Sequence, residues 1–361
     1  MDIVIRADAS ALIGAGHVMR CLTLAEALRK GGATVSFICR EWPGHLCDLI
    51  EQRGFLVAKL PAAQDTAGPT EWRGDAKETL AVMEAMGICP DWLVVDHYGL
   101  GCSWERALRP SVAHVMVIDD LASRQHDCDV LLDQNLSPKG PGRYAGLVDD
   151  SAVLLVGPEF ALIREEFRVM RQLMTQRFLA VVRIFVGFGG ADPDNAAGQV
   201  VSSLLDGKVG EVEIVVVAGA ANIHYPELEV LCQNVPTVKL YKNTDRMAEI
   251  LAGCDLAIGA GGVSALERCV LGIPSLIYSI ADNQVLASEG LAGMGAARYM
   301  GKMGNFDAGR LIEVVRQLLT DQQARQAMSR AAMEMVDGNG ALRIADLLLK
   351  SEKWGNTCLN H

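Results

Sequence analysis

The sequence predicts an α/β protein with two doubly wound domains, each a parallel sheet covered by helices. Short runs rich in valine and isoleucine alternate with longer amphipathic segments along almost the whole chain, which is typical of successive βαβ units. A charged amphipathic stretch at 159–178 interrupts the alternation once, and the alternation then restarts. The chain has 361 residues, 50% of them hydrophobic, which is enough for two such domains. We expect the two sheets to face each other across a cleft.

The first domain is expected over residues 1–157. Its strands are predicted at 2–6, 33–39, 55–60, 91–96, 113–118 and 152–156, and its helices at 18–30, 43–53, 74–87 and 102–109. Gly31 and Gly32 mark one transition clearly, because they follow a basic last helical turn and precede a β-branched run.

A connecting helix is expected over 158–180, and the second domain over 181–338. The strands of the second domain are predicted at 181–187, 211–218, 236–241, 255–259, 274–278 and 296–300, with helices between them. Residues 339–361 are expected to form a C-terminal helix, which could cross back onto the first domain, and a tail.

The composition restricts the partners that this chain could have. Its net charge is -11 and it contains no block of lysine or arginine, so it lacks the basic surface that nucleic acid or an anionic membrane requires. Ten scattered cysteines without a C-x-x-C pair are typical of free thiols in a reducing cytosol. No apolar run approaches the roughly 20 residues of a membrane helix, and no signal peptide is expected. We therefore expect a cytoplasmic protein that binds a small molecule.

The stretch "IGAGHVMRC" at 13–21 lies between the first strand and the first helix. A Rossmann dinucleotide fingerprint fails here, because Met19 occupies its last glycine position and the second strand ends without an acidic residue. A P-loop is excluded, since no Gly-Lys-Ser/Thr follows the glycines. The stretch instead presents His17 in the first turn of a helix, where the partial positive charge favours the neutral imidazole. His17 is thus a candidate general base, although it could merely cap the helix or pack against Asp8.

The stretch "GFGGADPDN" at 187–195 opens the second domain. Gly189 and Gly190 follow a strand, and Asp192 to Asp194 are typical of a helix start. Backbone N–H groups in such a turn can bind a diphosphate. An ordinary tight turn between strand and helix is the alternative.

The strongest motif is "CDLAIGAGGVSALERCVLGIPSLIY" at 254–278. Gly261 and Gly262 end a strand, Ser264 stands in the first turn of the next helix, and Glu267 follows three residues later. A glycine run at a helix start suits a phosphate, and the acid could accept the two hydroxyls of a ribose. Ser264 and Glu267 could instead form only a capping box. With Gly16 of the first loop and Gly189 and Gly190 of the second, these residues are the predicted phosphate and nucleotide loops.

Further polar residues follow other predicted strands. Asn283, between Asp282 and Gln284, could contact sugar hydroxyls or amides, or could simply start a helix. In the first domain the polar residues at strand ends are Asp96, His97, Tyr98, Asp119 and Asp120. No H-x-H or H-x-x-x-H pair occurs, so we predict that these residues shape the cleft and orient the substrate, and that the protein has no metal site.

Six motifs together resemble one known family. They are "RADASALIGAGHVMRCLTLA", "VVDHYGL", "VIDDLASRQHDCDVLLDQN", "GPEFALIREEF", "FGGADPDN" and "GGVSALERCVLGIPS". The chain resembles, from about residue 3 to 345, the UDP-2,4-diacetamido-2,4,6-trideoxy-β-L-altropyranose hydrolases of pseudaminic acid biosynthesis. Its second half is similar to the nucleotide domain of the peptidoglycan N-acetylglucosaminyltransferase. The resemblance implies two Rossmann-like domains of the glycosyltransferase-B (GT-B) type.

The resemblance also implies an activity and a set of roles. Water would attack the anomeric carbon of a UDP-sugar, the C–O bond to UDP would break, and the configuration would invert, without a metal or other cofactor. His17 would accept the proton of the water, Glu267 would hold the ribose, and Asn283 would contact the substrate near its sugar or phosphate. Arg164 and Tyr98 are further expected substrate contacts. The expected partner is the UDP-sugar, with neither nucleic acid nor membrane; a monomer is one possibility, and the sequence leaves the oligomeric state open. The segment at 62–78 makes the first domain longer than the family pattern and could alter the sugar pocket.

Two other functions remain open from the sequence. A GT-B glycosyltransferase would use the same donor but pass the sugar to an acceptor. A non-catalytic sensor of nucleotide-sugars would bind the same ligand, and the position of His17 would then be incidental.

Overall fold

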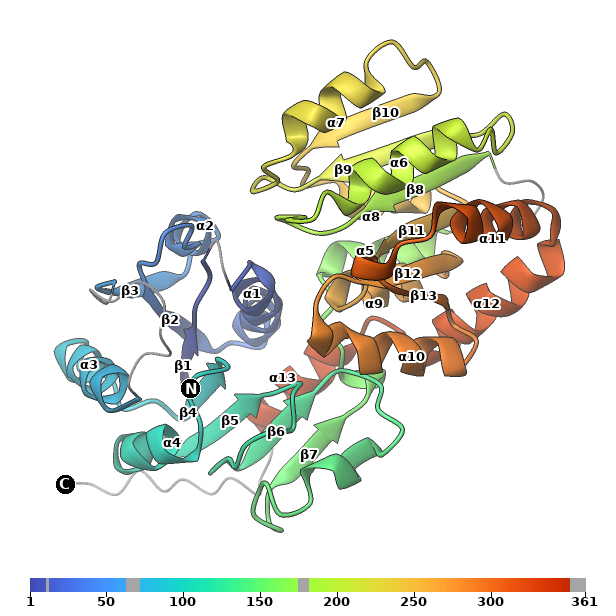
Figure 1. Ribbon diagram of the computed structural model, residues 1–361. Coiled ribbons are helices and arrows are strands. Elements are labelled where there is room, and N and C mark those ends of the chain that lie inside the picture. Colours follow the sequence, from blue (N-terminus) through green and yellow to red (C-terminus); the bar gives the residue numbers. More distant parts are fainter. Residues whose placement is uncertain (11–12, 63–71, 175–181, 351–361) are drawn as a thin grey trace. The chain divides into compact units, whose positions relative to one another are not determined.

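The computed structural model describes residues 1–10, 13–62, 72–174 and 182–350 (Figure 1). The chain divides into two compact units. Unit 1 comprises Met1–Asn135, Lys139–Leu162 and Asn339–His361, and unit 2 comprises Leu136–Pro138 and Ile163–Gly338. Unit 1 therefore receives the first and the last described helices of the chain.

Unit 1 contains a seven-stranded parallel sheet of order β3-β2-β1-β4-β5-β6-β7. Its strands are β1 (Asp2–Ala7), β2 (Thr34–Arg40), β3 (Leu56–Leu60), β4 (Trp92–Asp96), β5 (His114–Ile118), β6 (Val130–Asp133) and β7 (Val153–Val156). Its helices are α1 (Gly16–Lys30), α2 (Cys47–Gln52), α3 (Trp72–Ala85), α4 (Cys102–Leu108) and α13 (Gly340–Lys350).

The central strands of unit 1, from β2 to β6 in the sheet, are buried on both faces, as parallel strands covered by helices must be. Within β1, Ile3 and Ile5 pack into one apolar cluster, whereas Val4 between them packs into another on the opposite face. The first cluster also contains Ile344 and Leu348 of α13, which packs against α1 (Figure 1). Residues from the far end of the described chain thus complete the core beneath the first strand.

Unit 2 contains a six-stranded parallel sheet of order β10-β9-β8-β11-β12-β13. Its strands are β8 (Arg183–Gly187), β9 (Glu213–Ala218), β10 (Val238–Lys242), β11 (Leu256–Ala260), β12 (Ser275–Ser279) and β13 (Arg298–Lys302). Its helices are α5 (Glu165–Leu173), α6 (Ala196–Asp206), α7 (Tyr225–Cys232), α8 (Met247–Ala252), α9 (Val263–Val270), α10 (Val285–Gly293), α11 (Ala308–Thr320) and α12 (Gln322–Met335).

The two sheets share one winding pattern. In each, the chain builds outward from the first strand, returns to the other side of that strand, and continues outward from there. The winding direction therefore reverses between β1 and β4 in unit 1 and between β8 and β11 in unit 2. In open α/β sheets the ligand crevice lies at this reversal, beyond the carboxyl ends of the strands.

The predicted fold class of two doubly wound parallel sheets is confirmed. Strand β6 was not among the predicted strands, because its apolar run "VLL" spans three residues between charged neighbours. Parts of three expected segments lie outside the described residues: 63–71 of the segment at 62–78, 175–180 of the connecting helix, and the tail from 351. Among the described helices, none has both the length and the apolarity needed to cross a membrane.

Candidate functional site

His17 lies at the winding reversal of unit 1, in the first turn of α1. Its Nδ1 atom is 2.6 Å from Oδ1 of Asp96, the last residue of β4. His17 is 6% exposed and Asp96 is fully buried. Strands β1 and β4 are direct neighbours, so the start of α1 and the end of β4 meet at one point. Helix α1 has no side-chain cap, so His17 does not serve as one.

Arg20 fixes the Asp96 carboxylate from the same helix. Arg20 is three positions after His17 and therefore lies on the same face of α1. It donates from Nε to Oδ2 of Asp96 and from Nη2 to Oδ1, both at 2.6 Å. Burial alone would favour the neutral acid, but the positive charge of Arg20 and the hydrogen bonds from Arg20 and His17 hold the pKa of Asp96 well below its usual range. Asp96 is therefore an ionised acceptor.

This arrangement selects one tautomer of a neutral His17. An ionised carboxylate can only accept hydrogen bonds, so Nδ1 of His17 must carry the ring proton and donate a hydrogen bond to Asp96. The other ring nitrogen, Nε2, then carries a lone pair. A histidine oriented in this way by a buried carboxylate can accept a proton from water.

Of the two residues that follow Asp96, Tyr98 contacts the His17 ring and His97 contacts Asp8 instead. The Tyr98 ring, 37% exposed, meets the imidazole edge-on, with the ring centroids 4.5 Å apart and the planes at 83°. His97 turns away, with Nε2 3.4 Å from Oδ2 of Asp8. Asp8 is itself paired with the buried Arg6, so it is not the partner of His17.

The two acidic residues after β5 contact different groups. Asp120 accepts a hydrogen bond of 3.0 Å from Nη1 of Arg20, which connects it to the Asp96 pair. Asp119 is fully buried and accepts from the Tyr144 hydroxyl and from the backbone N–H of Ala122. Asp119 therefore supports the fold of this edge.

The glycine loop of unit 2 lies at the carboxyl end of β11. Gly262 is the N-cap of α9 with φ of 74°, a conformation that favours glycine, and a side chain at Gly261 would collide with Ser288. No side chain caps α9. The Ser264 hydroxyl points back to the carbonyl oxygens of Ala260 and Gly261. Ser264 and Glu267 therefore do not form a capping box, which was the purely structural explanation for this pair.

Two predicted site residues of unit 2 contact each other. Arg164, directly before α5, donates from Nε to Oε1 of Glu267 at 2.8 Å. Glu267 is only 7% exposed. Burial opposes the charge on Arg164, but Glu267 outweighs this and raises the pKa of the guanidinium above its ordinary value. Glu267 is thus held in a fixed position one turn inside α9.

The loop containing Gly189 and Gly190 has its own acid at the helix start. Asp192 is 2% exposed, and its carboxylate accepts from the backbone N–H groups of Ala196 and Ala197 at 2.8 and 3.0 Å. Asn195 caps the same helix, α6. Helix α6 therefore begins at residue 196 with its first amides occupied, three residues later than the motif suggests.

The turn after β12 presents Asn283 on the surface. Its neighbour Asp282 pairs with Lys302 at 2.7 Å, and the Gln284 side chain accepts from the backbone N–H of Ile280. Gln284 also lies beside the glycine loop, since its side chain would contact a Cβ placed on Gly261. The turn and the loop therefore form one edge of unit 2.

Several buried polar atoms near that edge have no hydrogen-bond partner among the described residues. They are Asn222 Nδ2, Arg268 Nε, Tyr278 Oη and Ser279 Oγ. Asn222 follows β9, Arg268 contacts the end of β11, and Tyr278 and Ser279 end β12. Buried polar groups normally have a hydrogen-bond partner, so four unpaired ones at the carboxyl ends of these strands are consistent with a ligand site there. None of the four is predicted by the sequence as a site residue, because the burial of a polar residue is not visible in a sequence pattern.

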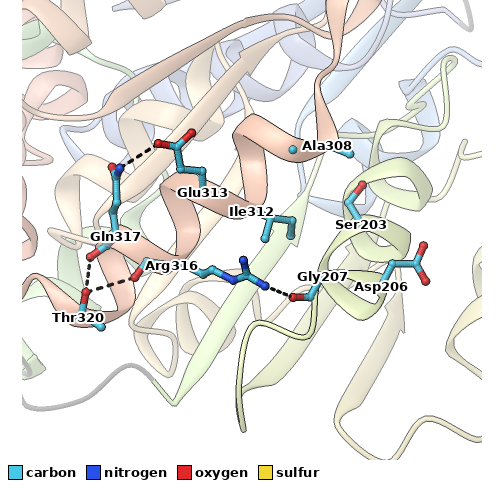
Figure 2. A pocket seen from close by; sticks show the side chains of 10 residues that line it. Ser203, Asp206, Gly207, Ala308, Ile312, Glu313, Arg316, Gln317 and Thr320 are labelled. Carbon is cyan, nitrogen blue, oxygen red and sulfur yellow. Dashed lines mark hydrogen bonds between the residues drawn. The ribbon is translucent and has the colours of Figure 1, made fainter.

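A groove of about 750 Å³ lies elsewhere in unit 2, between α6 and α11 (Figure 2). In it the Arg316 guanidinium donates to the carbonyl oxygen of Gly207, at the end of α6 opposite to Asn195. None of the predicted site residues lines the groove. In the described part of the chain, no group of three or more His, Cys, Asp or Glu residues is arranged to hold a metal ion.

The chain is similar in sequence to several known proteins, although no family model matches it. It is 26% identical over 283 residues to an uncharacterized protein of Methanocaldococcus jannaschii, which covers 77% of this chain but 55% of that protein. The chain thus spans little more than half of that relative. It is 25% identical over 256 residues to the UDP-2,4-diacetamido-2,4,6-trideoxy-β-L-altropyranose hydrolase of Campylobacter jejuni, covering 70% of this chain and 81% of the hydrolase.

A shorter segment is similar to a transferase. Over 115 residues, or 30% of this chain and 26% of the relative, it is 35% identical to the UDP-N-acetylglucosamine–N-acetylmuramyl-(pentapeptide) pyrophosphoryl-undecaprenol N-acetylglucosamine transferase of Xanthomonas oryzae pv. oryzae.

Solved structures show the same fold. A crystal structure of MurG from Acinetobacter baumannii matches 97% of this chain and 99% of its own, with a TM-score of 0.68 and 16% identity. The spinosyn rhamnosyltransferase SpnG matches 96% of this chain and all of its own, with a TM-score of 0.63 and 16% identity. The chain therefore has the GT-B fold and, as its motifs indicate, is similar to the UDP-2,4-diacetamido-2,4,6-trideoxy-β-L-altropyranose hydrolase.

Proposed function

We propose that this chain is a UDP-sugar hydrolase. It releases UDP and the free sugar from a UDP-linked 2,4-diacetamido-2,4,6-trideoxy hexose, as a step of pseudaminic acid biosynthesis. The similarity to the Campylobacter jejuni hydrolase supports the substrate class. The single observation that carries the proposal is the pair of His17 and Asp96 at the winding reversal of unit 1, because it provides an oriented base where an α/β sheet binds its ligand.

His17 acts as the general base in this reaction. Asp96 holds Nδ1, so Nε2 accepts a proton from water while the water oxygen attacks the anomeric carbon. The bond between that carbon and the phosphate oxygen breaks, UDP leaves with the bonding electrons, and the configuration at the carbon inverts. Asp96 then stabilises the imidazolium that forms, and the edge-on contact with Tyr98 helps to keep the ring in place.

The nucleotide binds to unit 2. The uncapped start of α9, at Gly262 and Ser264, supplies backbone N–H groups for the diphosphate and for the charge that develops on the leaving group. Gly261 leaves room for the ligand, while its own N–H donates to the carbonyl oxygen of Tyr278. Glu267, fixed by Arg164, accepts the ribose hydroxyls. Asn283, in the adjoining turn, contacts the substrate near its sugar or phosphate.

Gly189 and Gly190 contribute less to phosphate binding than the start of α9 does. Asp192 already occupies the first amides of α6, so this loop can contribute only its own backbone N–H groups. A carboxylate at that helix start also disfavours a second anion there. The start of α9 is therefore the main phosphate site.

A glycosyltransferase with a UDP-sugar donor is the second candidate. It is supported by the 35% identity to the N-acetylglucosamine transferase over 115 residues. The nucleotide site would serve both reactions, and the two candidates differ only in what attacks the anomeric carbon.

Incubation with UDP-sugars in oxygen-18 water, without an acceptor, tests the proposal. We expect UDP release, with the label in the sugar and none in UDP. Label in UDP would mean attack at phosphorus and would contradict the mechanism. If turnover requires an added acceptor, the protein is a transferase instead.

A further inference from the structure

Arg268 is a buried cation behind the glycine loop of unit 2. It lies in α9, is 1% exposed, and donates from Nη2 to the carbonyl oxygen of Ala260 at 2.7 Å. Its Nη1 lies 3.1 Å from the position of a Cβ on Gly259. The side chain thus runs back along α9 toward the helix start, and its guanidinium lies beside the last two residues of β11.

The charge of Arg268 lacks the carboxylate partners that the buried Arg6 and Arg20 have. Arg6 and Arg20, 0% and 5% exposed, are each paired with two carboxylates, whereas no carboxylate in the described part of the chain forms an ion pair with Arg268. Its Nε has no hydrogen-bond partner there either. Burial lowers the pKa of Arg268 to about 10, so the guanidinium still carries its charge at neutral pH.

A buried cation without a counterion is unfavourable unless something else supplies the negative charge. Gly261 and Gly262, which follow Ala260 directly, form the uncapped start of α9, whose partial charge is also positive. Two sources of positive potential therefore meet at one end of one helix. An anion bound at the loop would be attracted by both, and the low dielectric around Arg268 preserves its effect over the intervening distance.

We propose that Arg268 provides the countercharge for the diphosphate of the nucleotide bound at residues 261–264. The inference rests on the proposed function, since it assigns the diphosphate to this loop. Arg268 acts as a positioning residue without touching the ligand: its charge attracts the phosphates, and its hydrogen bond to Ala260 holds the strand end from which the loop starts.

Calorimetric titration with UDP and with uridine tests this role, because only UDP carries the phosphates. We expect Arg268→Gln, which stays polar but is shorter and has no charge, to bind UDP roughly tenfold more weakly and uridine within about twofold of the parent protein. Arg268→Lys, which keeps the charge, should retain most of the preference for UDP over uridine. Arg268→Met should behave like Arg268→Gln.

Arg325 offers a matched control. It is also a buried arginine of unit 2, at 3% exposed, and it donates to the carbonyl oxygens of Leu318 and Leu319, away from the loop. Arg325→Gln should lower the melting temperature without changing the ratio of UDP to uridine affinity.

The outcomes separate the inference from the proposed function. If the parent protein binds UDP and Arg268→Gln keeps the parent ratio, or loses UDP and uridine equally, the countercharge role is wrong. The same holds if Arg268→Lys loses UDP as fully as Arg268→Gln. If the parent protein itself binds no UDP, the nucleotide site and the proposed function fail together, before any variant is compared.

Discussion

Oδ1 of Asp96 lies 2.6 Å from Nδ1 of His17, although the two residues are 79 positions apart in the chain. The pair forms because β1 and β4 are neighbours in the sheet, so the helix after β1 starts beside the end of β4. Arg20 of α1 fixes the Asp96 carboxylate with two hydrogen bonds. The orientation of His17 thus depends on the winding of the sheet as well as on the loop that presents it.

Replacing Asp96 by Asn should impair catalysis far more than nucleotide binding. An amide can donate to Nδ1, which would leave the proton on Nε2 and remove the basic lone pair from the reacting face. We expect kcat to fall by roughly 10³-fold or more, with the affinity for UDP within about threefold. Steady-state kinetics and calorimetric titration with UDP measure the two effects.

A second buried pair in unit 1 provides the control for this variant. Nδ1 of His126 lies 2.6 Å from Oε1 of Glu105, and both side chains are fully buried. Glu105→Gln should lower the melting temperature while kcat changes little. A kcat loss like that of Asp96→Asn would show that any disturbed buried pair inactivates the enzyme, and would count against a specific role of Asp96.

His17→Ala should abolish turnover while UDP binding survives. The substitution removes the base but leaves Asp96 bonded to Arg20, so the local fold keeps its main ion pair. We expect a loss of about 10²- to 10⁴-fold in kcat. Release of UDP followed in time, together with titration by UDP, checks both parts. Substantial residual turnover would remove His17 from its assigned role.

Glu267→Gln tests the contact with the ribose. We expect UDP to bind roughly tenfold more weakly, because hydrogen bonds to a charged carboxylate are stronger than those to an amide. The sharper comparison uses 2′,3′-dideoxy-UDP: loss of the hydroxyls should weaken binding strongly in the parent protein and only slightly in Glu267→Gln.

The control is Glu166→Gln, because Glu166 is the other carboxylate near Arg164, at 2.9 Å from its Nη1. This variant should respond to loss of the hydroxyls as the parent protein does. If Glu267→Gln does so too, Glu267 is only the ion-pair partner of Arg164.

Asp133 should make the stability of unit 1 depend on pH. Burial raises the pKa of this carboxyl to about 6, although Arg143 donates to it at 2.6 Å. The unfolded chain has an ordinary pKa near ~3.9, so the folded state retains a proton that the unfolded state releases. This contribution to the free energy of unfolding is therefore full below about pH 4, falls between about pH 4 and 6, and is absent above.

Asp133→Asn removes this titration and shows its size. The difference in unfolding free energy between the parent protein and the variant should be about 2 kcal/mol smaller at pH 7.5 than at pH 4.5. Urea denaturation at both pH values, followed by a probe in unit 1, measures it. A difference that does not change with pH would contradict the assignment.

The sequence predicted the strands of unit 2 well, because valine-rich runs alternate there with clear helix starts and the buried strands are continuously apolar. The same clear helix starts placed His17 and Ser264 in first helical turns and Glu267 three residues after Ser264. Strand β6 was not predicted, because a run of three apolar residues between acidic residues is as common in loops as in strands.

The contacts within the site could not be predicted in the same way. The pairing of His17 with Asp96 depends on which strands are neighbours, and that of Arg164 with Glu267 joins residues 103 positions apart. The burial of Arg268 depends on how α9 packs against β11. These relationships arise from tertiary packing, which local periodicity does not encode.

The packing of α13 against α1 has a consequence for the making of the protein. Unit 2 is encoded almost entirely between the parts of unit 1, so a ribosome delivers all of unit 2 before it delivers Ile344 and Leu348. During synthesis, unit 1, which carries His17, therefore has an incomplete core at a time when unit 2 can already fold. Removal of α13 by proteolysis should accordingly destabilise the surroundings of His17 before it destabilises unit 2.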